Sequence, residues 1–144
     1  MFSPVKETTV CIIDDDPIFA FGFHKLSKNI GLFSQILHFT NGLEAVEYLT
    51  NPANAGYLPD VILLDINMPV MNGWEFSKKF EEIISHLGKN ITLYIMSSSV
   101  DTKDITRAKN IPLVTDYLFK PISTTHLTNI YNNLQSDTKQ FNYN

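Results

Sequence analysis

Five short, predominantly apolar segments recur along the chain, and stretches with helical spacing separate them. Runs of this length that are rich in branched side chains are typical of strands buried on both faces of a sheet. We therefore predict strands at residues 10–13, 35–39, 61–64, 91–96 and 117–119. The run at 61–64 consists of four branched aliphatic residues in succession and predicts the central strand.

Between these strands, apolar residues recur every three or four positions, which predicts amphipathic helices. The expected helices cover residues 17–30, 42–49, 74–87, 102–109 and 123–134. Asp16 before Pro17 is a good helix start, because aspartate caps a first turn and proline fits its first position. Gly31 and Gly88 are expected to end the first and third helices, and Asn41 to cap the second.

Strands that alternate with helices in this way indicate a doubly wound α/β fold, in which a parallel sheet carries helices on both faces. The length of 144 residues fits one domain, and the chain shows no internal repeat and no long linker. We assign residues 9–135 to this domain. Residues 1–8 are then an N-terminal extension, and residues 136–144 a polar tail that we expect to fray.

Composition narrows the class of function. Eleven Lys and Arg residues against 15 Asp and Glu give a net charge of −4, without a basic stripe. We therefore expect no direct nucleic-acid partner. The single cysteine, Cys11, has no intrachain partner, which favours a reduced, cytoplasmic setting. The lack of a signal-like leader and of an apolar run of ~20 residues argues against a membrane location.

Polar side chains at the ends of the predicted strands carry the candidate chemistry. The first strand is followed by Asp14 and Asp15, the third by Asp65, the fourth by Ser97 and the fifth by Lys120. Because the carboxyl ends of parallel strands lie on one edge, we expect these side chains to converge in one crevice. Two carboxylates a few ångströms apart repel by roughly 4 kcal/mol, which a cation would offset. Hard oxygen ligands in an open site suit Mg²⁺.

Each of these residues also has a plainer explanation. An aspartate after a strand is often a turn or cap residue, and capping accounts fully for Asp16. Lys120 could merely balance the acids at the surface, and Ser97 could merely begin the polar turn 97–99. The combination of three acids, a hydroxyl and an ammonium group favours a functional site over these separate roles.

Together these residues resemble the receiver domain of two-component response regulators, over about residues 9–135. The Asp14-Asp15 pair matches the acidic metal-binding pair of that family, and Asp65 within the segment 65–73 matches its phospho-acceptor motif. Ser97 matches the hydroxyl position, and Lys120 precedes a proline as it does in the family.

Two further positions complete the comparison with this family. Tyr117 matches its switch aromatic. One departure lies at residues 110–115, where Ile-Pro-Leu-Val replaces the common Ala-Gly-Ala segment. This difference affects the end of the fourth helix and so part of the expected output surface.

The resemblance implies a flavodoxin-like (βα)5 fold with strand order 2-1-3-4-5 and a role as a phospho-acceptor in two-component signalling. A histidine kinase or phosphotransfer protein would supply the phosphoryl group of an aspartyl phosphate on Asp65. Mg²⁺ would be held by Asp15, Asp65 and the main-chain carbonyl of Asn67, with Asp14 helping through water. Such a domain catalyses only its own phosphorylation and dephosphorylation and is not otherwise an enzyme.

The resemblance also implies how the signal leaves the site. Lys120 and Ser97 would contact the phosphoryl group, and Tyr117 would rotate inward in response. The fourth helix, fifth strand and fifth helix would then form the face that a downstream protein binds.

Two other functions of the same fold class fit the residues poorly. Phosphatases of the haloacid-dehalogenase kind place their nucleophile after the first strand with a second aspartate two residues on, whereas Asn67 follows Asp65 at that spacing. A flavodoxin-type carrier would need a phosphate cradle after the first strand, where this chain has acids. Within the receiver family, Met1 and the ten-residue tail favour a stand-alone regulator over a receiver excised from a hybrid kinase.

Some chemically conspicuous residues are expected to be structural. The four histidines lie on scattered elements without ligand spacing: His24, His38, His86 and His126. Trp74 begins a helix and is expected to pack. Phe19, Phe21 and Phe23 splay around their helix, and an exposed member of this group would mark a docking face.

Overall fold

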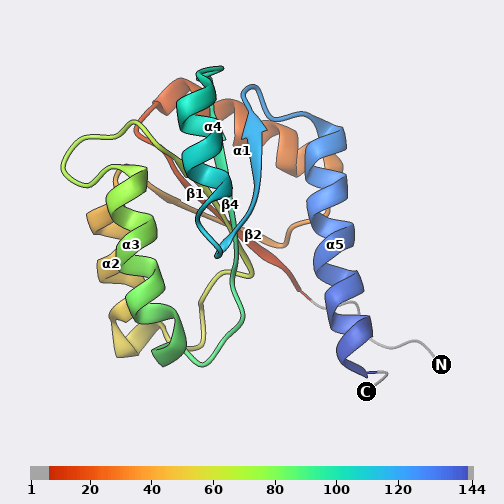
Figure 1. Cartoon of the computed structure of the whole chain (residues 1–144). Coiled ribbons are helices and arrows are strands. Elements are labelled where there is room, and N and C mark those ends of the chain that lie inside the picture. The colour runs from red at the N-terminus through yellow and green to blue at the C-terminus, as the bar shows by residue number, and fades with distance from the viewer. Residues whose placement is uncertain (1–6, 143–144) are drawn as a thin grey trace.

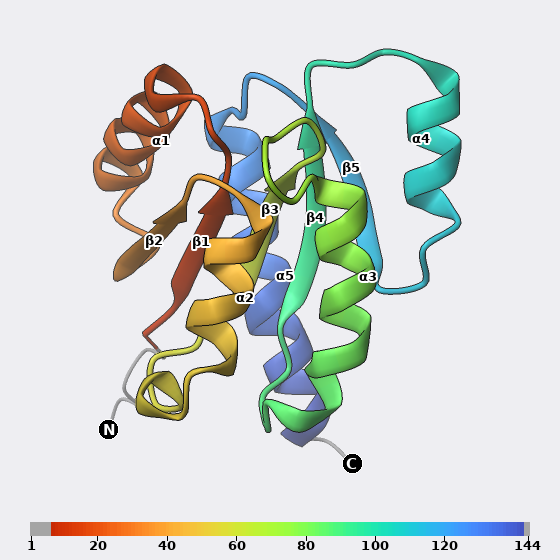
Figure 2. The same cartoon turned by 90° about the vertical axis from the view of Figure 1, so that its left-hand side faces the viewer.

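A five-stranded parallel sheet forms the centre of the molecule (Figures 1 and 2). The computed structural model describes the backbone of residues 7–142 and the side chains of residues 7–136. The strands are β1 (Thr9–Ile13), β2 (Gln35–Phe39), β3 (Val61–Asp65), β4 (Thr92–Ser97) and β5 (Val114–Phe119). Their order across the sheet is β2-β1-β3-β4-β5, which confirms the predicted order and puts β3 in the middle.

Helices cover both faces of this sheet, as the alternating pattern predicted. They are α1 (Pro17–Ile30), α2 (Gly42–Thr50), α3 (Gly73–Ile83), α4 (Thr102–Lys109) and α5 (Thr124–Asn142), with short 3-10 turns η1 (Pro52–Asn54) and η2 (Ile84–His86). Side chains of α1 and α5 pack on one face, and those of α2, α3 and α4 on the other. In the part of the chain that the structure describes, no helix is both long and apolar enough to span a bilayer.

Burial on both faces of the sheet explains why the sequence of the central strand β3 is continuously apolar. Val61 and Leu63 point into the core under α1 and α5, whereas Ile62 and Leu64 point into the core under the other three helices. All four side chains are fully buried. A strand covered on both faces cannot alternate with polar residues, because each side chain is removed from water.

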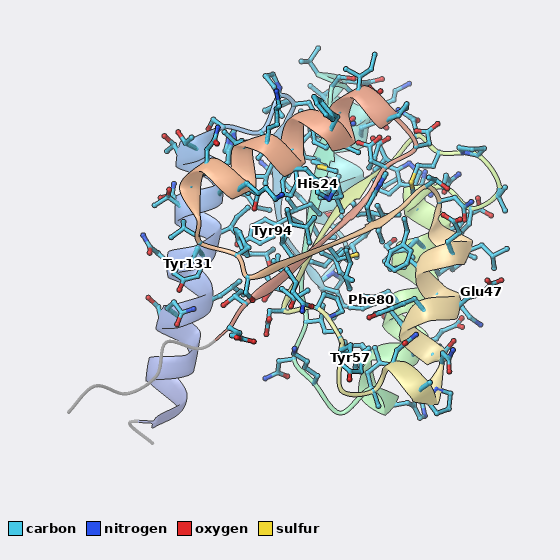
Figure 3. All side chains as sticks on the ribbon, turned by 180° about the vertical axis from the view of Figure 1, so that it is seen from behind. His24, Glu47, Tyr57, Phe80, Tyr94 and Tyr131 are labelled. Carbon is cyan, nitrogen blue, oxygen red and sulfur yellow. The ribbon has the colours of Figure 1, made fainter. Side chains whose placement is uncertain are left out.

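Aromatic pairs fill the two cores beside the helices. Phe76 and Phe80 of α3 stack with their ring centroids 5.6 Å apart. On the opposite face lies Tyr131 of α5, which is labelled in Figure 3. Its ring meets that of Phe33 edge to face, with the centroids 5.8 Å apart. Such pairs contribute about 1 kcal/mol beyond the area they bury, so they help to fix the helices against the sheet.

Three element boundaries differ from the sequence prediction by more than one residue, two of them in the third helix and the fifth strand. The third helix ends as an α-helix at Ile83, and the next three residues tighten into η2 before Gly88, whose φ is 68°. The fifth strand begins at Val114 rather than Tyr117. Its added residues Thr115 and Asp116 are exposed on an edge strand, so they carry no apolar signal.

The fifth helix extends well beyond its predicted end. It was expected to stop at Leu134, but it continues to Asn142, through most of the tail that was expected to fray. Residues 135–142 contain neither Gly nor Pro, so nothing in that segment forces the helix to end. The predicted N-terminal extension lies outside the described residues except for positions 7 and 8, where Thr8 is buried.

Candidate functional site

Three acidic side chains converge at the carboxyl edge of the sheet, as the strand ends predicted. Asp14 follows β1 and Asp65 ends the neighbouring β3, and Asp15 completes the group. One carboxylate oxygen from each lies within 4.8 Å of the other two. Asp14 and Asp65 are buried whereas Asp15 is exposed, so the cluster reaches the solvent at Asp15.

Lys120 joins this cluster from the end of β5. Its Nζ donates to Asp14 Oδ2 at 2.5 Å and lies 3.7 Å from Asp65 Oδ1. The ammonium group also lies 4.4 Å from the centroid of the Phe19 ring. Its backbone N–H donates to the Ser97 carbonyl at 2.9 Å, which fixes the end of β5 against the end of β4. The lysine is therefore a structural part of the site, held between two carboxylates.

Burial dominates the electrostatics of Asp65. It raises the pKa of this carboxyl to about 6, with further upward contributions from the charges of Asp14 and Asp15. Lys120 and the backbone N–H of Asn67 act in the opposite direction, because both favour the charged form. A carboxyl with this pKa is mostly ionised at neutral pH, which is the state that a nucleophile needs.

Hydrogen bonds hold Asp14 and its neighbours in place. The backbone N–H of Asp16 donates to Asp14 Oδ1 at 2.9 Å, and Asp16 itself caps α1 by accepting from the N–H of Ile18. The capping role predicted for Asp16 is therefore confirmed. His38 Nε2 donates to the Asp14 carbonyl at 2.9 Å, so this histidine supports the site through the backbone. The sequence predicts a structural or surface role for His38 but does not predict this contact with the acidic cluster.

The loop between β3 and α3 folds tightly beside Asp65. A side chain at Gly73 would place its Cβ 2.5 Å from the Asp65 carbonyl oxygen, so only glycine fits this close approach. Val70 has a φ of 66°, and the N–H of Met71 donates across it to the Pro69 carbonyl at 2.7 Å. A β-branched residue is strained in this conformation. The strain lies in the loop that joins Asp65 to α3.

Ser97 and Tyr117 are both buried and meet through the loop that follows β4. Ser97 Oγ accepts from the N–H of Ser99 at 3.0 Å. The Tyr117 hydroxyl donates to the carbonyl of Ser99 at 3.0 Å. The tyrosine, for which the sequence predicted an inward movement, already has its ring inside in this structure. Ser99 therefore connects Ser97 to Tyr117. The sequence did not predict this connection, because Tyr117 reaches Ser99 from another strand.

Some of the residues expected to be structural make contacts within the protein, whereas others are exposed. His24 Nδ1 donates to the carbonyl of Ala20 within α1 (Figure 3), and Trp74 packs against Arg107. Phe23 is buried, whereas Phe21 is 64% exposed and its neighbour Ile18 is 81% exposed. Phe21 is therefore the exposed aromatic residue of this group, and its place in a docking face stays a prediction.

The donor set fits a magnesium ion. Carboxylate oxygens are the ligands that this ion prefers, and opposite ligands of an octahedral site lie about 4 Å apart. One carboxylate oxygen from each of Asp14, Asp15 and Asp65 lies within 4.8 Å of the other two, close enough for the three groups to surround one cation. The residues present therefore fit a Mg²⁺ ion.

Comparison with known proteins agrees with this geometry. The sequence model of the Response regulator receiver domain matches residues 10–132. The Sensor histidine kinase CheAY of Helicobacter pylori is 34% identical over 121 residues, which are 84% of this chain and 14% of that protein. The Regulator of RpoS of Escherichia coli K12 is 27% identical over 122 residues, 85% of this chain and 33% of that protein. The chain thus spans a minor part of the length of these curated relatives.

Solved structures are similar over a larger share of their length. A two component response regulator from Cytophaga hutchinsonii has a TM-score of 0.82 and 31% identity, covering 92% of this chain and 99% of that chain. A response regulator receiver protein from Dyadobacter fermentans has a TM-score of 0.75 and 29% identity, covering 88% and 97%. The similarity extends over nearly the whole sheet and its helices.

Proposed function

Because this chain belongs to the response regulator receiver domain family, we propose that it accepts a phosphoryl group onto Asp65 and signals through phosphorylation-dependent protein contacts. The observation that carries this proposal is the position of Asp65, at the end of the central strand between a lysine and two further acids. The phosphoryl donor is a phosphohistidine of a histidine kinase or phosphotransfer protein.

In the proposed reaction, an oxygen of Asp65 attacks phosphorus as the bond from phosphorus to the donor imidazole nitrogen breaks. The imidazole leaves with the electron pair of that bond, and Asp65 becomes an acyl phosphate. Positioning and electrostatics supply most of the catalysis in such a transfer. Lys120 lies 3.7 Å from Asp65 Oδ1, close enough to neutralise a phosphoryl oxygen with a small side-chain movement.

Magnesium is the cofactor that this site would use. Asp15, Asp65 and the main-chain carbonyl of Asn67 would hold it, with Asp14 acting through water. When bound, the ion supplies positive charge to the phosphoryl oxygens. Asp14 is paired with Lys120 in this structure, which leaves the exposed Asp15 the more accessible of the two neighbouring acids.

The output surface is proposed to be the face made by α4, β5 and α5. The Ser97 hydroxyl would donate a hydrogen bond to an oxygen of the new phosphoryl group, and the loop that follows Ser97 would move inward with it. Val100 in that loop is 77% exposed, and Phe119 on β5 is 45% exposed. Exposed apolar side chains beside a responsive loop suit a protein partner. We propose no direct nucleic-acid contact and a cytoplasmic location for this signalling domain, which acts on no separate substrate.

Incubation of the purified chain with acetyl phosphate, with and without Mg²⁺, tests the proposal. We expect one acid-labile phosphoryl group per chain only when Mg²⁺ is present. Asp65→Asn should abolish incorporation, whereas Asp16→Asn should incorporate as the wild type does, because Asp16 only caps α1. Lys120→Met should fold. It should either accept phosphate more slowly than the wild type or fail to transmit the conformational change that follows phosphorylation. Full labelling of the Asp65→Asn variant would contradict the assignment.

A further inference from the structure

All the polar groups of Ser99 are engaged, which is unusual for a residue in a surface loop. Its N–H donates to Ser97 Oγ, and its carbonyl accepts from the Tyr117 hydroxyl. Its own Oγ donates to Asp104 Oδ2 at 2.8 Å and accepts from the N–H of Asp101 at 3.2 Å. The residue therefore connects β4, β5 and the first turn of α4.

The bond to Asp104 is the strongest of these connections. It joins a hydroxyl donor to a carboxylate, and charge-assisted bonds are shorter and roughly twice as strong as neutral ones. Asp104 is also anchored, because it lies in the first turn of α4, where its N–H donates to the Asp101 carbonyl and the helix dipole favours a negative charge. Ser99 is thus held by a fixed partner.

We propose that Asp104 is a positioning residue for the switch: through Ser99 it presents a carbonyl to Tyr117 and holds that ring inside before Asp65 is phosphorylated. No ligand is needed for this arrangement, since every contact is already present in the structure. The inference rests on the switch role proposed for Tyr117, but it concerns the resting balance of the ring. A ring that is already inside at rest leaves phosphorylation a smaller change to make, because a ligand only shifts an existing equilibrium.

The competing explanation is that packing alone keeps Tyr117 inside. Its ring lies 5.4 Å from that of Phe119, edge to face, and it belongs to the core under α2, α3 and α4. Under that explanation, the carboxylate of Asp104 has no influence on the ring. A substitution of Asp104 distinguishes the two explanations. It changes the exposure of the Tyr117 ring only if the hydrogen bonds through Ser99 hold that ring inside.

The test uses the full chain with isotope-labelled tyrosine rings, and follows Tyr117 by NMR in the unphosphorylated state. Comparison with Tyr117→Phe assigns the signal, and broadening by a soluble paramagnetic reagent reports the exposure of the ring. Asp104→Leu and Ser99→Ala should each raise the exposed-to-buried ratio by about tenfold, as expected for the loss of one charge-assisted hydrogen bond. Asp104→Asn keeps an oxygen acceptor without the charge and should fall between the wild type and Asp104→Leu.

Asp101→Ala is the matched control for general loosening of α4. It removes the helix cap bond to the N–H of Lys103 but leaves the Ser99–Asp104 pair untouched. Its Tyr117 signal should remain as protected as in the wild type. The proposal is overturned if Ser99→Ala leaves the ring fully buried, or if Asp101→Ala exposes it as much as Asp104→Leu does. Phosphate labelling of Asp65 is measured separately, so failure of the proposed function and failure of this inference are distinguishable.

Discussion

The guanidinium group of Arg107 in α4 lies over the indole ring of Trp74, 4.4 Å from the ring centroid. Trp74 is the second residue of α3 and follows Gly73, whose N–H donates to the Ile66 carbonyl beside Asp65. The stacked pair therefore connects α4 to the loop that leaves the acidic cluster.

Removal of this stacking should change the environment of the only tryptophan in the chain. Arg107→Ala should shift the emission of Trp74 and cost about 1 kcal/mol or less of unfolding free energy, as expected for an exposed cation–π pair. Arg107→Lys should retain part of the effect. Lys103→Ala, on the same helix and exposed, is the control and should leave the emission unchanged.

Magnesium binding should depend on Asp15 and not on Asp16. Asp15 contributes an oxygen to the acidic cluster, whereas Asp16 directs its carboxylate to the N–H of Ile18. Asp15→Asn should weaken Mg²⁺ binding about tenfold or more, and Asp16→Asn should change it little. Titration of Trp74 fluorescence measures both. Equal weakening by the two substitutions would mean that the cluster does not hold the ion.

The raised pKa of Asp65 predicts a pH-dependent cost of folding. The folded pKa of about 6 lies above the ordinary value of 3.8, so the carboxyl prefers to be protonated in the folded state. The stability that this preference provides is present below pH ~4 and is lost as the pH rises through ~6. Without Mg²⁺, Asp65→Asn should therefore exceed the wild type in unfolding free energy by on the order of 2 kcal/mol at pH 7.

Urea unfolding at pH 4, 5, 6 and 7 measures this difference. It should be small at pH 4 and grow toward pH 7, and it should shrink when Mg²⁺ is added, because the cation stabilises the ionised wild type. A difference that stays constant with pH would show that ionised Asp65 is not penalised by the fold.

Relief of the backbone strain at Val70 should stabilise the protein. A non-glycine residue at a φ of 66° costs about 1–3 kcal/mol, and the added freedom of glycine in the unfolded chain returns about 0.5–1 kcal/mol of that. Val70→Gly should thus raise the unfolding free energy by about 1 kcal/mol. Val100→Gly, also exposed and in a loop but without a positive φ, should lower it. Thermal unfolding of the two variants gives the comparison directly.

The sequence predicted the strands and the acidic crevice because their signals are local. Val61 to Leu64 are apolar in succession, and Asp65 comes directly after them, so both the strand and its end are visible without any tertiary information. The parallel arrangement then requires the strand ends to meet at one edge.

The features that sequence did not predict depend on contacts between distant segments. Val114 and Asp116 belong to β5 because β4 pairs with them on one side, and Thr115 is an extra residue between them at an irregularity of the pairing. The side chains of Thr115 and Asp116 are exposed, so they carry no apolar signal. The role of Ser99 likewise depends on Asp104 and Tyr117 reaching it from a helix and another strand. The support that His38 gives to Asp14 requires β2 to lie beside β1.

The burial of Cys11 gives this protein an internal measure of how often its sheet opens. Burial raises the pKa of the thiol, and the strand that carries it is paired on both sides, with β2 and with β3. An alkylating reagent in solution therefore needs the centre of the sheet to separate before it meets a reactive thiolate. When reclosing is faster than alkylation, the labelling rate of this one sulfur atom tracks the equilibrium fraction of opened molecules. Each variant described above could thus be ranked by thiol alkylation under native conditions, without any denaturant.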